Sequence, residues 1–544
     1  MSGRYSLAFG SLPEGPAPTP RAPRRVRIAL FADLGARREI ETGAALAARR
    51  PRLLDIDTLD EVIAAGRTTL ALPIGDEGAS VAVPLASLDD LHPDAVYQAV
   101  GLFDDLARLR RRVAGGDTEA AVAALRAWGD AFAEALAPPA AADPGTAVPL
   151  DAGLSDFERL IGEAIPDMAA TAPPGGEDAL DRLLGQIVGP HVVAAEDPRQ
   201  ATMLAAVDAA IADAMRRVLH HPAFQAIEST WRALETVARR VETDETVEIV
   251  VYDITAAEWA ADLSGAEDLS ETGLYRLLVE APARDGGPGP VSAVFALYTL
   301  DESPVHAALL ARMARIAARA GAPFVTALSA RALARPAETR AAVIEETWAA
   351  LRALPDAAYL GLVAPRWLAR LPYGKGSDPI ERFAFQELGA DQGPEALLWA
   401  NPAALAAVLF AGCAAAGEGV PDLTAVLEVG DMPYHTVTDR YGSVAALPCT
   451  ERPLTHDEAL ATLGRGVMPL LAIRGRTDVR LGGFQSLAGT PLAGAWHRVA
   501  AGEGGALGPA VPDPAALGAA LAALAAHDED FTGPDALERL ISRG

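Results

Sequence analysis

The stretch Val291-Ser292-Ala293-Val294-Phe295-Ala296-Leu297 decides the fold class. It is almost entirely apolar and follows a Gly-Pro pair, which is typical of a strand buried on both faces of a sheet. A helical pattern over residues 305–320 separates it from a second short apolar run, residues 324–328. Strand, helix and strand in this order indicate parallel pairing. We therefore predict an α/β fold of mixed α+β character, with long helices.

The same reading extends in both directions along the chain. Short runs with strand patterns occur at residues 26–31, 81–85, 247–252, 359–363, 425–429 and 467–473. Apolar residues at helical spacing predict helices over residues 93–113, 203–218, 224–237 and 402–416. Pro222 is expected to end the helix before it, because the residue preceding a proline is disfavoured in the α region.

Pro- and Gly-rich sequence divides the chain into two parts. We predict an N-terminal domain over residues 1–137, a linker over 138–178, a larger domain over 179–490 and an Ala/Gly-rich C-terminal tail over 491–544. Residues 5–9 are a further candidate strand, and residues 500–526 a candidate Ala-rich helix.

Composition excludes several functional classes. The 544 residues include 46 Lys plus Arg against 73 Asp plus Glu, a net charge of −27. That balance argues against nucleic-acid binding, which works through a basic surface, and against a polybasic membrane-surface protein. No apolar stretch is long enough to span a membrane. Two cysteines cannot form a disulfide framework, so we expect a cytoplasmic protein without membrane insertion.

The sequence lacks residues that the candidate motifs for cofactor or metal binding require. Gly374-Lys375 would belong to a phosphate loop only with a glycine five residues before it, where the chain has Ala369. His220 and His221 are adjacent, so their side chains diverge, and no further histidine lies at helical spacing. Cys413 and Cys449 are expected to be buried small side chains. We therefore predict no enzyme activity, no cofactor and no metal.

Aromatic and apolar residues at fixed spacing form the remaining signal. The order is His220-His221-Pro222, Phe224-Gln225, Glu228 and Trp231-Arg232-Ala233-Leu234. It predicts a helix, a proline break and a second helix with a large tryptophan anchor. From the residue types and their spacing alone, packing in a hydrophobic core is the simplest explanation of this pattern.

These residues also resemble the large subunit (TssC/VipB) of the type VI secretion system contractile sheath. Residues 219–234 resemble its signature "LHHPxFQxLExxWRGL", and residues 359–374 resemble "YVGLxxPRxLLRLPYG". Further blocks agree in order: residues 322–324, Phe383 to Glu387, 398–401, 448–451, 466–470 and 477–487. Together they cover roughly residues 180–490.

The N-terminal part resembles the small sheath subunit (TssB/VipA). Residues 26–35 are similar to its "VxGVxADLSG" strand, residues 54–62 to "IDxDNFDEVM", and residues 88–110 to "SLDDFxPDxVxxQVPxLxxLLELR". The two subunits normally occur as separate, interlocking chains, so the resemblance implies a natural fusion of small and large subunits.

The resemblance implies a structural protomer of a helical sheath that polymerises around an inner tube and ejects it by contracting. The implied partners are other copies of the chain, an inner-tube (Hcp-like) protein, baseplate proteins and a hexameric disassembly ATPase. Trp231 and Phe224 are expected to anchor the helices, and Arg366, Arg370 and Tyr373 to fix a loop. His221, Pro222 and Trp399 complete the set of predicted structural or interaction residues.

The chain departs from the family pattern after residues 485–487. The family continues there with a substantial C-terminal region, whereas this sequence becomes Ala/Gly-rich, so we expect a shortened C-terminus. Two sheath functions stay open: a working fused protomer, or a divergent, non-contractile sheath-like subunit that caps, initiates or regulates assembly. An unrelated α/β enzyme is the remote alternative.

Overall fold

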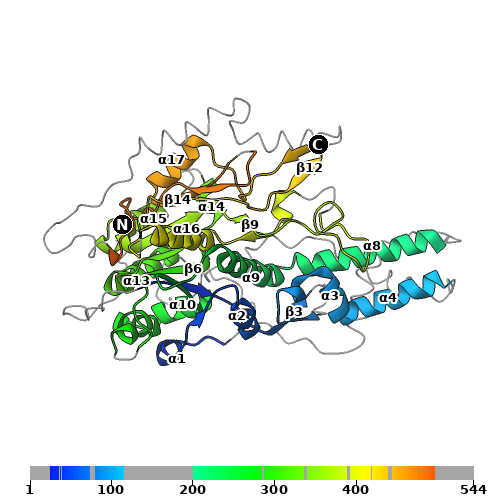
Figure 1. Ribbon diagram of the computed structural model, residues 1–544, viewed down its shortest axis with the longest axis horizontal. Helices are drawn as coiled ribbons and strands as arrows, with labels where there is room; N and C mark the ends of the chain where they lie inside the picture. The colour runs from blue at the N-terminus through cyan, green and yellow to red at the C-terminus, as the bar shows by residue number, and fades with distance from the viewer. Residues whose placement is uncertain are drawn as a thin grey trace, which may run out of the picture.

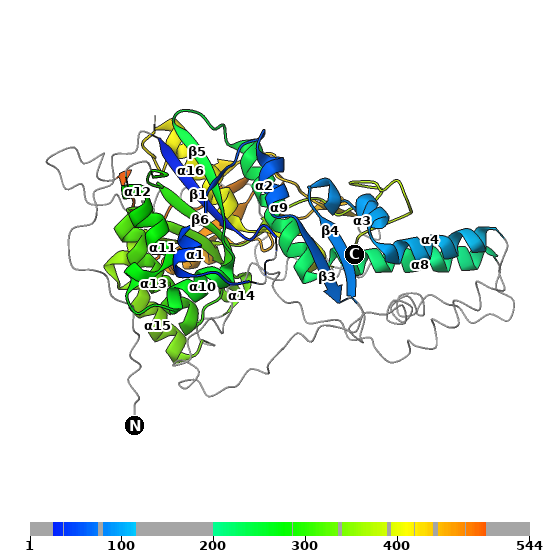
Figure 2. The same cartoon turned by 90° about the horizontal axis from the view of Figure 1, so that it is seen from below.

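The computed structural model describes residues 25–35, 37, 39–73, 80–115, 200–284, 287–335, 340–388, 393–417, 419–438, 444–473 and 475–496. The predicted strand at 5–9, the linker at 138–178 and the helix at 500–526 lie outside these residues, as does the tail beyond residue 496. The described residues form a body built on a large sheet, from which two helices, α4 and α8, project side by side as an arm (Figures 1 and 2).

The sheet of the body has nine strands in the order β11-β15-β14-β8-β7-β6-β1-β5-β2. The run from β14 to β5 is parallel, and β15, β11 and β2 add antiparallel edges. An α/β fold is therefore confirmed. The strands are β1 (Val26–Ala32), β2 (Arg52–Leu53), β5 (Val247–Asp253), β6 (Ala293–Leu300), β7 (Phe324–Leu328), β8 (Leu360–Ala364), β11 (Glu428–Val429), β14 (Val467–Ala472) and β15 (Val479–Leu481).

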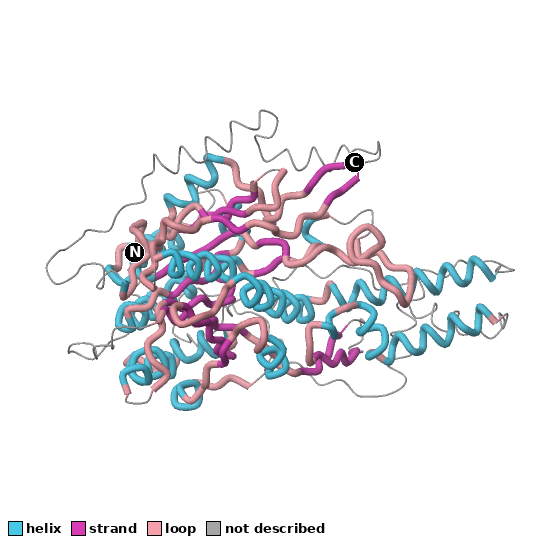
Figure 3. Tube along the Cα trace, in the orientation of Figure 1, coloured by secondary structure: helices cyan, strands magenta, loops and turns pink. Residues whose placement is uncertain are grey.

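Strands in two-stranded ladders complete the β structure. These are β3 (Thr68–Pro73) with β4 (Ser80–Leu85), β9 (Trp367–Leu368) with β10 (Trp399–Ala400), and β12 (Thr436–Thr438) with β13 (Val444–Ala446). Figure 3 shows that most strands gather in the body, whereas the outer arm is helical.

Helices cover both faces of the sheet. Alternate residues of β1 point to opposite faces: Ile28 and Leu30 pack with α9 and α16, and Ala29 and Phe31 pack with α10 and α13. The helices are α1 (Gly43–Ala47), α2 (Leu59–Ala65), α3 (Pro93–Ala99), α4 (Gly101–Ala114), α8 (Gln200–Leu219), α9 (Pro222–Arg240), α10 (Ala256–Ser264), α11 (Gly273–Tyr275), α12 (Ala281–Ala283), α13 (Pro304–Ala320), α14 (Ala330–Ala334), α15 (Ala342–Arg352), α16 (Pro402–Ala416) and α17 (His456–Gly464).

The most informative feature of the sheet is the position of β1. It pairs in parallel with β5 over its whole length, from Val26 opposite Val247 to Ala32 opposite Asp253. On its other side Ile28 to Phe31 pair with Ala293 to Ala296 of β6. The predicted N-terminal domain therefore supplies a central strand to the sheet of the predicted larger domain.

Several predicted elements differ from the structure. The predicted helix over 93–113 is divided at Val100, whose extended backbone (φ −105°, ψ 116°) ends α3 and precedes α4. A β-branched residue favours such a conformation. The predicted strand 291–297 is shifted to β6, and the predicted strand 425–429 is reduced to the two residues of β11. Strand β3 was not predicted.

Candidate functional site

The N-terminal part of the chain meets the larger part at helix α9. His221 caps this helix by accepting a hydrogen bond on Nδ1 from the Ala223 amide at 3.2 Å. Pro222 occupies the first helical position, where its missing N–H leaves no bond unmade. Burial lowers the pKa of His221, which favours the neutral ring that capping requires.

Two predicted anchors of α9 are fully buried. Phe224 and Trp231 both have 0% of their surface exposed. The Trp231 indole N–H donates to the backbone carbonyl of Leu34 at 2.9 Å. Leu34 directly follows β1, so this bond ties α9 to the N-terminal part of the chain through 197 residues of sequence separation.

A buried ionic cluster lies beside these anchors and is formed by Arg370, Glu228, Glu387 and Tyr373, here called the Arg370 cluster. The Arg370 guanidinium makes bidentate hydrogen bonds with Glu228 at 2.6 and 3.1 Å and with Glu387 at 2.7 and 3.1 Å. Such paired bonds are the strongest class of protein hydrogen bond. The cluster joins α9 to the loop around residues 370–387.

Tyr373 completes the cluster with both its ring and its backbone. The Arg370 guanidinium carbon lies 4.0 Å from the centre of the Tyr373 ring, a cation–π contact. The Tyr373 amide donates to Glu387 at 2.7 Å. His220 and Arg232 lie at the margin, 3.5 Å from Glu387 and 4.0 Å from Glu228. Arg232 thus adds a second guanidinium on the side of Glu228.

Charge pairing outweighs burial in the ionisation of Glu387 and Arg370. Burial by itself would raise the pKa of Glu387, but Arg370, His220 and the Tyr373 amide lower it to about 2. Burial likewise opposes the charge of Arg370, yet Glu228 and Glu387 raise the pKa of its guanidinium well above the ordinary value. Burial raises the pKa of Tyr373, so its phenol stays neutral.

The loop beyond the cluster docks on the N-terminal part of the chain. Asp94 accepts hydrogen bonds from the amides of Glu381 and Arg382, both at 3.0 Å. The Tyr97 ring stacks on Phe383 at 4.9 Å. His92 meets the Tyr373 ring edge-on at 5.1 Å. The cluster is therefore the point where α9, the loop and the N-terminal part converge.

Arg366 and Trp399 lie outside the Arg370 cluster. Arg366 makes a bidentate pair with Glu451 at 2.8 and 2.6 Å. The Trp399 indole donates to the Pro394 carbonyl at 3.0 Å, and the Trp399 carbonyl accepts from Ser229 at 3.2 Å. Both residues fix loops against the body, at separate places.

The sequence analysis did not identify Glu228 and Glu387 as the partners of Arg370. A signal was present for Glu228, because it stands on the apolar face of α9 beside Ile227 and Trp231. An ionised group at such a position requires a partner. No comparable local signal marks Glu387 or Asp94.

The carboxyl ends of the central strands hold a second ionic cluster. Parallel sheets commonly bind ligands at this edge. Here Arg49 pairs with Glu258 at 2.6 Å, and Arg37 contacts Glu258 and Asp253, both at 3.2 Å. Glu258 also closes a capping box with Thr255 at the start of α10. These contacts fill the edge with intramolecular ion pairs, a structural arrangement.

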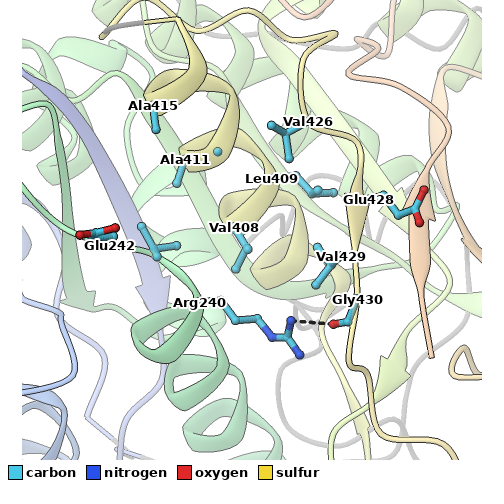
Figure 4. Close-up of a pocket in the computed structure, with 12 residues that line it drawn as sticks. Arg240, Glu242, Val408, Leu409, Ala411, Ala415, Val426, Glu428, Val429 and Gly430 are labelled. Carbon is cyan, nitrogen blue, oxygen red and sulfur yellow. Dashed lines mark hydrogen bonds between the residues drawn. The ribbon is translucent and has the colours of Figure 1, made fainter.

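A pocket of about 410 Å³ lies along α16 (Figure 4). Its lining is mostly apolar and includes Val408, Ala411 and Val429. Arg240 crosses one end and donates to the carbonyls of Gly430 and Asp431 at 2.7 and 2.8 Å. Because the Arg240 guanidinium is engaged by these two carbonyls, the pocket offers few polar groups that a ligand could bind.

The described ranges hold neither a cluster of metal ligands nor a membrane-spanning helix. Within them, no group of three or more His, Cys, Asp or Glu side chains is arranged to hold a metal ion. None of the helices described has the length and apolarity needed to cross a membrane.

Comparison with known proteins identifies the family of this body. Residues 201–488 match the VipB family model, described as EvpB/VC_A0108, tail sheath N-terminal domain. The match covers more than half of the chain and includes α9, the Arg370 cluster and the strands that follow one another in sequence from β5 to β15. The chain belongs to the VipB tail sheath family. Strand β1 lies outside the matched residues.

One curated relative shows the same family. The type VI secretion system sheath protein TssC1 of Pseudomonas aeruginosa is 32% identical over 308 residues, which are 53% of this chain and 61% of TssC1. The chain therefore spans less than two thirds of that relative. VipB family members are structural sheath proteins, which agrees with the structural character of the Arg370 cluster.

Proposed function

We propose that the chain is a single-chain protomer of a type VI secretion contractile sheath, a structural protein in which residues 25–115 take the place of the small subunit. The observation that carries this proposal is the position of β1. It stands outside the family match and yet lies between β5 and β6, in the centre of the family domain's sheet. A VipB body with this arrangement needs such a strand to be complete.

Burial supports the same conclusion. Ile28, Ala29, Leu30 and Phe31 are all 0% exposed. Removing β1 would leave the facing edges of β5 and β6 unpaired and would open both cores. Unpaired apolar strand edges promote aggregation. The fused segment thus acts as an internal partner, supplied at one copy for each family domain.

Assembly follows from the family likeness. A subunit that contacts its neighbours through two different surfaces forms an open helical polymer when the contact does not close. The resemblance adds an inner-tube (Hcp-like) protein, baseplate proteins and a hexameric disassembly ATPase as predicted partners. ATP hydrolysis would belong to that ATPase and not to this chain.

Negative-stain electron microscopy tests the proposal. The purified full chain is examined alone and with an Hcp-like inner-tube protein. Hollow tubes are the expected result. Discrete particles under both conditions, with helix and sheet content intact by circular dichroism, would overturn the protomer proposal and favour a subunit that caps or regulates assembly.

A further inference from the structure

Lysine is nearly absent from this chain. The sequence contains one lysine, Lys375, beside 45 arginines. Apart from two contacts of histidine with a carboxylate, the ion pairs of the described residues use arginine, whose planar guanidinium suits bidentate pairing. A lysine ammonium differs from it, since it is a compact, strongly hydrated charge on a flexible stem. Lys375 is thus the one basic side chain of this sequence, other than histidine, that is not an arginine.

Lys375 stands on an exposed turn that directly follows the Arg370 cluster. All residues from 375 to 379 are exposed, whereas Tyr373 is 1% exposed. In the described structure, Lys375 makes no ion pair and no side-chain hydrogen bond with another described residue. Its charge is therefore available at the surface of a chain with a net charge of −27.

The turn is held firmly at its base. The Gly374 amide donates to the Asp378 carbonyl at 2.7 Å, and the Ser377 amide donates to the Gly374 carbonyl at 3.1 Å. The Ser377 hydroxyl also bonds the Pro372 carbonyl. On the returning side, the Glu387 amide donates to the Tyr373 carbonyl at 2.9 Å. A rigid base presents the exposed ammonium at a defined position, which lowers the entropy cost of a contact.

We infer that Lys375 is a contact between protomers, in which its ammonium binds an acidic surface of a second copy of this chain. The inference rests on the proposed sheath function. Copies that each carry a charge of −27 repel one another, and a cation placed against a carboxylate of the neighbouring copy offsets part of that repulsion. A presented, unpaired lysine on an anchored turn provides such a cation.

Zero-length carbodiimide cross-linking tests the contact, because it joins an amine to a carboxylate that touches it. Tubes are assembled from an equal mixture of ¹⁵N-labelled and unlabelled full chain. Peptide mass spectrometry then separates cross-links between copies from those within one copy. With one lysine in the chain, cross-links from Lys375 are unambiguous, and those from the α-amino group carry a different peptide.

The expected result is a mixed-label cross-link from Lys375 to an Asp or Glu in tubes and its absence in unassembled protein. Acetylation of Lys375, measured by intact-mass spectrometry, should be slower in tubes than in unassembled protein. Tubes that show neither effect would overturn this contact and leave the sheath function standing. A failure to form tubes at all would overturn the sheath function and this contact with it.

Three variants sharpen the result. Lys375→Glu should raise the protein concentration needed for tubes about tenfold, because attraction becomes repulsion. Lys375→Arg keeps the charge and should assemble while losing the cross-link. Arg284→Glu, a charge reversal at an exposed site that pairs with Glu280 four residues earlier, serves as the matched control. Equal assembly of Lys375→Glu and wild type would contradict the contact.

Discussion

Two of the junctions that join the N-terminal part of the chain to the family domain differ in character. At the sheet junction, β1 is inserted between β5 and β6 with its apolar side chains buried on both faces. At the arm junction, α4 lies along α8, and Arg110 pairs with Asp208 while 46% and 34% of these side chains stay exposed. Both junctions bury apolar side chains, but the ion pair of the arm junction is partly exposed and is expected to add little to stability.

Placing a charge in β1 tests the sheet junction most severely. Leu30→Asp puts a carboxylate in a fully buried position between two strands. An unpaired buried charge is expected to destabilise the protein by more than about 4–5 kcal/mol. Thr69→Asp, on the exposed face of β3, is the matched control. Circular dichroism melts of both variants decide the matter, and a folded Leu30→Asp protein would refute the central role of β1.

Breaking the Arg370 cluster should have the next largest effect. Arg370→Met leaves Glu228 and Glu387 buried without their main cation, which we expect to cost about 3–5 kcal/mol in the free energy of unfolding. Arg366→Met, which removes a partly exposed pair with Glu451, should cost less. Urea unfolding compares the two. Equal losses would show that burial does not distinguish the two pairs.

Trp231 links the sheet junction to α9. Trp231→Ala removes a fully buried side chain and is expected to lower the free energy of unfolding by about 3–5 kcal/mol. Trp231→Phe keeps most of the volume but leaves the Leu34 carbonyl without its donor, at a cost of about 1–3 kcal/mol. Thermal melts give both values. An unchanged melting temperature for Trp231→Ala would contradict its role as an anchor.

The ionisation of Glu387 predicts a pH dependence. Its pKa is lowered from the usual 4.5 to about 2 in the folded protein. The stabilisation from its charge is therefore complete above pH 4.5 and is lost as the pH falls through 2. The stability difference between wild type and Glu387→Gln should shrink over that range. Urea unfolding at pH 6 and pH 3 measures it, and a constant difference would contradict the pairing.

The smallest effect is expected at the arm junction. Arg110→Ala removes a partly exposed ion pair and should change the free energy of unfolding by no more than about 1 kcal/mol. Added salt should reduce the difference further because it screens exposed charges. Chemical unfolding at low and high salt provides the measurement. A loss as large as that of Arg370→Met would remove the distinction between the two junctions.

Local features of this protein were determined by its sequence. The apolar runs predicted the buried strands β1, β5, β7 and β8, and Pro222 predicted the break between α8 and α9. Such features depend on neighbouring residues, through backbone sterics, capping and the alternation of side chains. The motif residues likewise indicated the VipB family, because they are a property of the sequence alone.

Only the tertiary structure decided which distant segments meet. Strand β1 lies between β5 and β6, which follow it by more than 200 residues. Arg370 pairs with Glu228 and Glu387, and Asp94 accepts hydrogen bonds from the amides of residues 381 and 382. A parallel strand can pair with any neighbour of suitable burial, and a buried arginine accepts any carboxylate within reach. The hydrophobic periodicity of a segment does not identify its partner, because the packing of the whole chain determines which segments meet.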